Sequence, residues 1–230
     1  MAQEQTRGAI AAFTGKASHC PYSTEHLINW YDNIHIKDVI STSGMRTAYR
    51  FSSLNPSNQT PWLVFYPVND IAFFSTDEFR SIPTGSDKHL GGRQFLDLAN
   101  GELRILKRLG VWESEKPKIG VANLIVVESI KPKADSNAEF QQWYTTEYLD
   151  MIKKIPGFRR TSLFHLEASI RRDGAPTFTI FHEFDLDEEP TELLRMARES
   201  SSSKQHLSQA EIVEYDSLEL KLQKGVFDSL

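Results

Sequence analysis

The stretch "LINWYDNIHIKDVISTSGMRTAYRF", residues 27–51, decides the fold because it occurs a second time in diverged form. It aligns without a gap with "FQQWYTTEYLDMIKKIPGFRRTSLF", residues 140–164. Tryptophan, tyrosine and glycine rarely recur by chance at one spacing, so the match indicates an internal repeat. The identical pairs, all at the same offset, are Trp30/Trp143, Tyr31/Tyr144, Gly44/Gly157, Arg46/Arg159 and Phe51/Phe164.

Short apolar runs of strand length surround both copies. "AIAAFTGKAS" (9–18) aligns with "ANLIVVESIK" (122–131) at the same offset, and "PWLVFYPVND" (61–70) aligns with "PTFTIFHEFD" (176–185) after a small shift. Their β-branched and aromatic residues favour strands. Residues typical of a helix N-terminus come next, in "STDEFRSI" (75–82) and "EPTELLRMARES" (189–200). Each copy closes with a strand candidate, "LRILKRLGVWE" (103–113) or "SLELKLQKGVF" (217–227).

The predicted order is therefore βαββαβ, twice, which is an α+β arrangement of two tandem ferredoxin-like units. Charge and proline interrupt the pattern in "ESEKPKIG" (113–120), so we place the units at 1–116 and 117–230. Each unit has helices on one face of its antiparallel sheet and leaves the other face bare. The other unit is the simplest cover, which predicts one intramolecular α+β barrel with its helices outside.

Composition excludes several classes of protein. The 230 residues are 40% hydrophobic and 25% charged with a net charge of -5, which is ordinary globular chemistry without a basic surface for nucleic acid. Cys20 is the single cysteine, and no Cys/His cluster has metal-ligand spacing, so we predict no disulfide and no metal. No uncharged apolar run approaches the roughly 18 residues of a membrane span. We expect a cytoplasmic protein without a membrane partner; whether two chains pair as a homodimer stays open.

The repeated helix carries a family likeness. A Trp-Tyr pair, three residues, a histidine and an apolar stretch into Pro-Gly or its equivalent resembles the first-helix signature of the dimeric α+β barrel superfamily, particularly its EthD-like branch. That family usually builds its barrel from two chains. The resemblance implies enzymes of fungal secondary metabolism, namely cofactor-free cyclases, dehydratases, decarboxylases and monooxygenases acting on polyketide-type substrates. Heme-binding and isomerase branches also exist, so the fold alone fixes no reaction.

The two copies differ at the position of the signature histidine. The first has His35, whereas the second has Tyr148, and Ser43 stands where the second has Pro156. Loss of one site after duplication is the simplest interpretation, which places the active cavity in the first half. His35 lies four residues from Tyr31, so a regular helix would turn it toward the sheet. It either donates to a backbone carbonyl and packs or, as the resemblance implies, lines a cavity and moves a proton.

Other residues could complete such a site. The stretch "SDKHLGG" (86–92) around His89 echoes "SSKQHLSQ" (202–209), and some plant polyketide cyclases of the superfamily carry a catalytic histidine in the matching stretch; a surface histidine is the alternative. Tyr66 and Tyr49 could donate to an enolate oxygen or simply pack. For Trp62, on the same predicted strand as Tyr66, ordinary sheet packing is the favoured interpretation. The polar run "RESSSSKQHLS" (198–208) predicts a flexible loop.

We therefore expect an enzyme with His35, His89 and Tyr66 as catalytic residues. Its substrate-binding residues would be Tyr31, Tyr49, Trp62 and Asp32, with Asp32 either orienting the imidazole or facing solvent. The first hypothesis is a cofactor-free lyase or cyclase of secondary metabolism that acts on a polyketide-like or similarly apolar carbonyl substrate by cyclisation, dehydration, decarboxylation or pericyclic closure. The alternatives are a cofactor-independent monooxygenase, in which a substrate carbanion meets O2, and a non-catalytic binding or stress-response barrel. Heme stays open, because related tandem barrels bind it through a second-half histidine; the candidates are His165, His182 and His206.

Overall fold

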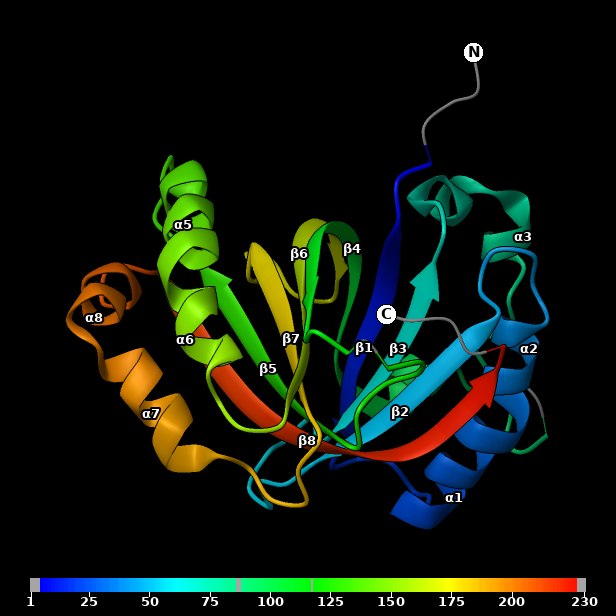
Figure 1. Ribbon diagram of the computed structural model, residues 1–230. Helices are drawn as coiled ribbons and strands as arrows, with labels where there is room; N and C mark the ends of the chain where they lie inside the picture. Colours follow the sequence, from blue (N-terminus) through cyan, green and yellow to red (C-terminus); the bar gives the residue numbers. More distant parts are fainter. Residues whose placement is uncertain (1–4, 86–87, 117, 227–230) are drawn as a thin grey trace.

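The computed structural model of the protein describes residues 5–85, 88–116 and 118–226. Both halves have the same order of elements, except that the first has an additional 3-10 helix, η2, after its third strand (Figure 1). The first half contains β1 Gly8–Lys16, α1 Thr24–Trp30, η1 Tyr31–His35, α2 Ile36–Ile40, β2 Thr47–Ser53, β3 Trp62–Val68, η2 Ile71–Ser75, α3 Asp77–Arg80, α4 Phe95–Leu98 and β4 Ala99–Glu113. The second contains β5 Leu124–Lys131, α5 Asn137–Trp143, η3 Tyr144–Tyr148, α6 Leu149–Lys153, β6 Phe158–Ile170, β7 Phe178–Phe184, α7 Thr191–Glu199, α8 Ser201–Leu207 and β8 Ile212–Gly225.

These strands form one closed barrel in the order β1-β3-β2-β8-β5-β7-β6-β4. Each half contributes a four-stranded ferredoxin-like sheet, and the last strand of each half pairs antiparallel with the other half: β4 with β6, and β8 with β2. The α+β barrel predicted from the sequence is thereby confirmed. Figure 1 shows α1–α3 on one side of the barrel and α5–α8 on the opposite side.

The inside of the barrel is a packed core rather than a channel. Phe65, Phe164 and Phe181 meet there edge to face, with ring centroids 4.9 to 5.7 Å apart. Such contacts between aromatic rings add to the burial of their area. Residues from both halves complete this interior cluster, among them Ala11, Tyr49, Leu106, Ile125 and Leu218. Any ligand site must therefore lie at a barrel end or between the sheet and the outer helices.

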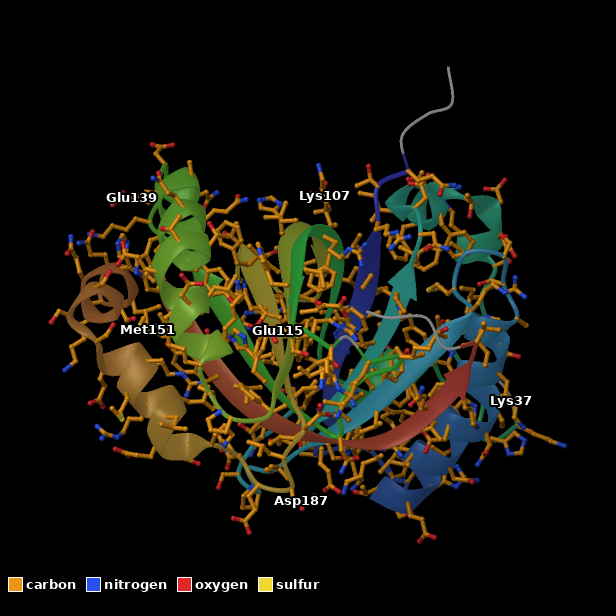
Figure 2. The ribbon with its side chains drawn as sticks, in the orientation of Figure 1. Lys37, Lys107, Glu115, Glu139, Met151 and Asp187 are labelled. Carbon is orange, nitrogen blue, oxygen red and sulfur yellow. The ribbon has the colours of Figure 1, made fainter. Side chains whose placement is uncertain are left out.

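The outer helices are amphipathic. Ser23 caps α1, because its side chain accepts a hydrogen bond from the backbone N–H of His26. Leu27 and Trp30 then face the sheet and are buried. Lys37 of α2 and Glu139 of α5 point away from the barrel into solvent (Figure 2). Each half thus has a second apolar layer between helix and sheet, which is where the sequence places its candidate site.

Each first helix contains a five-residue π turn at the repeated position, Tyr31–His35 and Tyr144–Tyr148. The N–H of Ile36 bonds to the Tyr31 carbonyl, five residues back instead of four. This wider turn moves Ile36, which is fully buried, into the sheet-facing position, and leaves His35 half-buried at the edge. The expectation that His35 lies fully within the sheet-facing stripe is corrected accordingly. Such turns interrupt α-helices most often at functional sites.

The strand alignment of the two halves was wrong by one residue. At the offset of the helices, Ala12 matches Ile125, yet Ala12 packs under the first-half helix and Ile125 faces the barrel interior. Tyr66 and Phe181, matched after the small shift, are likewise on opposite faces. A slip of one residue moves every side chain of a strand to the other face. By position within their seven-residue strands, Tyr66 of β3 corresponds to His182 of β7.

The polar run at 198–208 is a helix for most of its length, not a flexible loop. Ser200 caps α8 by accepting from the backbone N–H of Ser203. The Ser202 hydroxyl accepts from the Trp143 indole N–H at 2.9 Å and donates to Glu147. His206 stacks on the Trp143 ring at 4.6 Å. The composition of these serines suggests a loop, but their hydroxyls make hydrogen bonds that cap the helix or join it to the neighbouring helix.

An isolated first half, residues 2–116, is not expected to be a stable monomer. Without the second half, β2 and β4 would lose their partners β8 and β6, and Phe65 would lose the aromatic rings that it packs against. We expect this fragment to self-associate or to precipitate in size-exclusion chromatography. A monomeric fragment with cooperative thermal unfolding would contradict the account of the barrel.

Glu183 makes barrel stability depend on pH. Burial raises the pKa of its carboxyl to about 7, although Arg160, 3.5 Å away, and the Ala122 N–H oppose the shift. Above pH 4.5, the ordinary pKa of this carboxyl, the unfolded state loses the proton while the folded state keeps it. The stability that this group contributes therefore falls as the pH rises from 4.5 to about 7. Relative to the wild type, Glu183→Gln should gain unfolding free energy between pH 5 and pH 8 in urea titrations. An equal difference at both pH values would contradict this assignment.

Candidate functional site

Two buried phenols form the centre of the first-half cleft between helix and sheet. Tyr31 comes from the π turn and Tyr66 from β3, and both belong to the apolar layer under the helix. The Tyr66 hydroxyl lacks a hydrogen bond of good geometry within the described part of the chain, although the Tyr31 phenol is the polar group beside it. Burial raises the pKa of Tyr31 to about 12 and that of Tyr66 well above its ordinary value. Both phenols are therefore protonated donors at neutral pH.

His35 lies against Tyr31 at the edge of the cleft. Its ring stacks on Trp30 at 5.4 Å and meets the Tyr31 ring edge to face at 4.8 Å. The Nδ1 atom lies 2.9 Å from the Pro83 carbonyl oxygen. A carbonyl can only accept, so Nδ1 carries the proton and Nε2 keeps the lone pair. Burial lowers the pKa of the imidazole, which makes the neutral form, a base at Nε2, the dominant one at pH 7.

Asp32 points away from the imidazole. Its two carboxylate oxygens accept from the Arg50 guanidinium on β2 at 2.6 and 2.7 Å, a bidentate pair that is largely buried. The Asp32 backbone carbonyl also accepts from Lys224 of β8. Asp32 therefore ties the π turn to β2 and to the last strand of the other half, rather than orienting His35.

The structure places the other predicted site residues in different parts of the molecule. Trp62 faces the helix beside Tyr31 and Arg50. Tyr49 is fully buried on the opposite face of the sheet, inside the barrel, and cannot reach the cleft. The side chain of His89 is exposed, and its backbone carbonyl lies 2.8 Å from the His26 Nε2 atom. Ser86 and Asp87 of the stretch around His89 lie outside the described residues.

The space within the first-half cleft is small in this conformation. A cavity of about 10 Å³ lies among Tyr31, Trp62, Arg50, Thr14 and Phe95. Sites for organic ligands usually enclose roughly 300–1,000 Å³. A substrate can enter only if the helix and the sheet separate, and the π turn, where the regular α-helical ladder is broken, is the natural place for that movement.

The second-half cleft holds the same residue types in exchanged positions. Tyr144 corresponds to Tyr31, while the helix carries Tyr148 where the first half has His35, and β7 carries His182 where β3 has Tyr66. His182 and Tyr148 are almost completely buried. The His182 Nδ1 atom lies 2.9 Å from the Thr161 hydroxyl. The off-by-one strand alignment hid this correspondence in the sequence.

Glu128 of β5 places a buried carboxylate in the second-half cleft, where it forms a cluster with neighbouring polar and charged side chains. Its carboxylate accepts from the Tyr148 hydroxyl at 2.8 Å and from Arg198 at 3.1 Å, and lies 3.5 Å from the His182 Nε2 atom. Burial acts to raise its pKa, but His182, Arg198 and Tyr148 outweigh burial and lower it. Ala12 occupies the matching position in β1, so the first half has no such carboxylate. The sequence analysis missed Glu128; a carboxylate within the apolar run "LIVVESIK" was the available signal.

The second-half histidines do not suit heme ligation. Both ring nitrogens of His182 already face protein groups, and the residue is completely buried. His206 is stacked on Trp143 and borders a cavity of only about 20 Å³, whereas His165 lies beside Glu167 near the surface. We derive no chemistry through heme. Among the described residues, no group of three or more His, Cys, Asp or Glu side chains is placed to hold a metal ion.

The described helices include none that is both long and apolar enough to cross a membrane. No family model matches the sequence. Over 175 residues, the chain is 28% identical to core atranone cluster (CAC) protein 1 of Stachybotrys chlorohalonatus, an alignment that covers 68% of this chain and 73% of that protein.

Three solved structures have a similar fold. An anthrone oxidase-like protein superposes with a TM-score of 0.63 at 12% identity, covering 97% of this chain and 94% of that one. A candidate monooxygenase from Fusobacterium nucleatum gives 0.58 at 10% identity, with 99% and 98% covered. A chlorite dismutase from Candidatus Nitrospira defluvii gives 0.56 at 12% identity, with 94% and 92% covered. These similarities over nearly the whole chain show that the protein shares the α+β barrel fold of these structures.

Proposed function

We propose that this protein is a cofactor-free enzyme of secondary metabolism, a lyase or cyclase that removes a proton beside the carbonyl of a polyketide-like substrate. The observation that carries the proposal is the hydrogen bond from His35 Nδ1 to the Pro83 carbonyl. It supports a neutral imidazole with its lone pair on Nε2, and the ring lies against Tyr31, whose phenol, like that of its neighbour Tyr66, stays protonated. A base and a hydrogen-bond donor in one apolar cleft are the two groups that enolisation requires.

The proposed reaction begins with transfer of a proton from the carbon beside the carbonyl to Nε2 of His35. The electron pair of the broken C–H bond moves into the enolate, whose oxygen accepts a hydrogen bond from the Tyr66 hydroxyl. The enolate carbon then attacks a second carbonyl of the same substrate or expels a leaving group. The imidazolium returns its proton to the new alkoxide or to the leaving group. No net oxidation occurs, and Trp62 with Tyr31 would hold the apolar body of the substrate.

The relative from the atranone cluster supports a role in secondary metabolism. The similarity to an anthrone oxidase-like protein and to a candidate monooxygenase supports a second candidate function, a cofactor-independent monooxygenase. Both functions share the first step, formation of an enolate. They differ in the electrophile, which is O2 in the monooxygenase.

Anthrone is a tricyclic aromatic ketone whose methylene group is conjugated with the carbonyl through two aromatic rings instead of standing beside it. Loss of a methylene proton gives an extended enolate, so anthrone tests the shared step and separates the two functions. In D2O under nitrogen, the protein should accelerate exchange of the anthrone methylene protons for deuterium, followed by NMR. In air, a monooxygenase would convert anthrone and O2 to anthraquinone and water, with matching consumption of oxygen. Exchange without oxygen consumption above the buffer rate supports the lyase or cyclase. Exchange at the buffer rate would contradict the proposed base.

A further inference from the structure

A cavity much larger than that of the first-half cleft lies at one end of the barrel, away from His35. It is open at the end of the barrel where β1 begins and the β3 arrow ends (Figure 1), and it encloses about 690 Å³. This volume is within the range of sites for small organic ligands. Phe65 and Phe164, whose rings are almost completely buried in the interior core, lie at its base, and Pro67, Phe73 and Val226 supply the apolar surface of its lining.

Three arginines line the same cavity, from three separate segments. Arg7 precedes β1, Arg46 precedes β2, and Arg108 lies in β4. Burial is the main cause that lowers the pKa of Arg108, and the positive charges of Arg7 and Arg160 lower it further. Like charges therefore lie close together at this end of the barrel. Asp70 is the acidic residue in the lining, and its carboxylate caps η2 through the Ala72 N–H. The remaining positive potential favours an anion.

In the second half, the arginine at the position corresponding to Arg46 is neutralised by an acidic residue. Arg159, the repeat of Arg46, pairs with Asp185 at 2.7 Å, and Lys118 contacts the same carboxylate at 2.8 Å. Asp185 directly follows β7. The residue that directly follows β3 is Asn69, which also lines the cavity. In the described part of the chain, Arg46 makes no ion pair. The first half thus keeps the arginine and has an uncharged amide where its carboxylate partner would stand.

We propose that this cavity binds an aromatic carboxylic acid, whose carboxylate contacts Arg46 and the neighbouring arginines while its ring lies against Pro67, Phe73 and Val226. An inorganic anion would leave this apolar part of the lining without a contact, and a neutral arene would leave the arginines without a counter-ion. A ligand with both parts matches both surfaces. The site is independent of the proposed reaction, because it shares neither His35 nor Tyr66 with the cleft.

Binding of 2-naphthoate to the full chain, measured by isothermal titration calorimetry, tests the proposal. We expect one saturable site whose affinity falls with salt. Asn69→Asp supplies the carboxylate that the second half has and changes no cavity volume; it should raise the dissociation constant about tenfold or more, as should Arg46→Gln. Arg159→Gln is the matched control and should bind as the wild type does.

The uncharged probe 2-naphthol and inorganic phosphate separate the two parts of the site. We expect 2-naphthol to bind at least about tenfold more weakly than 2-naphthoate. Millimolar phosphate should not displace 2-naphthoate. Absence of saturable binding, equal binding of the two naphthalenes, displacement by phosphate, or full affinity in Asn69→Asp would each overturn the proposal. Thermal unfolding of every variant confirms that it is folded before titration.

Discussion

Replacing His35 by tyrosine is expected to lower the rate of enolisation by about 100-fold to 10,000-fold, the usual contribution of a general acid or base. The fold should survive, because Tyr148 occupies the same position of the second π turn and is almost completely buried. His35 is itself half-buried at the edge of the cleft, which leaves room for a longer ring. Deuterium exchange of anthrone under nitrogen gives the rate, and thermal unfolding gives the stability.

His165→Tyr is the matched control, because it makes the same chemical change at a partly exposed histidine of β6. We expect it to keep both the exchange rate and the unfolding temperature. A folded His35→Tyr protein with the wild-type exchange rate would show that His35 only packs against Trp30. Tyr66→Phe supplies a second test: it removes one hydroxyl from an unpartnered position, so it should lower the rate without lowering stability.

Replacing Glu128 by leucine is expected to cost about 3–5 kcal/mol of unfolding free energy, the usual effect of removing one partner from a buried charge cluster. The substitution leaves Arg198, whose side chain is 20% exposed, without its carboxylate. It also removes the acceptor of the Tyr148 hydroxyl and the charge beside His182. Urea unfolding at pH 7 measures the loss.

Two further variants separate charge from packing. Glu128→Gln keeps an oxygen that can accept from Tyr148, so it should cost less than the leucine variant. In the double variant Glu128→Leu with Arg198→Met, both charges are gone, and much of the lost stability should return. A Glu128→Leu protein as stable as the wild type would contradict the account of this cluster.

The repeat was predictable from the sequence because its markers have structural reasons to persist. Trp30 and Trp143 are buried between helix and sheet in both halves, and each π turn begins one residue later. Gly157 adopts a positive φ of 77° after α6, which side chains other than glycine rarely adopt. These constraints preserved the motif, so the order of elements and the barrel followed from it.

The register of the strands was not predictable, because β1, β3 and β7 are buried on both faces. Buried residues follow one another along these strands without alternating with exposed ones, so the sequence does not say which face a given side chain occupies. For that reason Tyr49 was grouped with Tyr66, although the sheet separates them. The same ambiguity hid His182 as the counterpart of Tyr66.

The π turn was a second feature without a signal in the sequence. Helical spacing of four residues placed His35 beside Tyr31 on the buried stripe, but the extra residue in the turn gave that position to Ile36. The consequence is chemical, since the half-buried edge lets His35 reach the Pro83 carbonyl. The arginines of the barrel end come from segments far apart in sequence, and only the closed barrel brings them together.

The most direct test of the central claim compares two titrations. One is the pH dependence of deuterium exchange into anthrone under nitrogen; the other is the NMR titration of the His35 ring in the same protein. Burial lowers the pKa of His35 below 6.5, so the base form dominates at neutral pH and is lost as the pH falls. The account predicts a rate that is constant above pH 7 and falls at lower pH with the pKa of His35. A rate that follows a pKa different from that of the His35 ring, or that stays constant while the ring titrates, would contradict it.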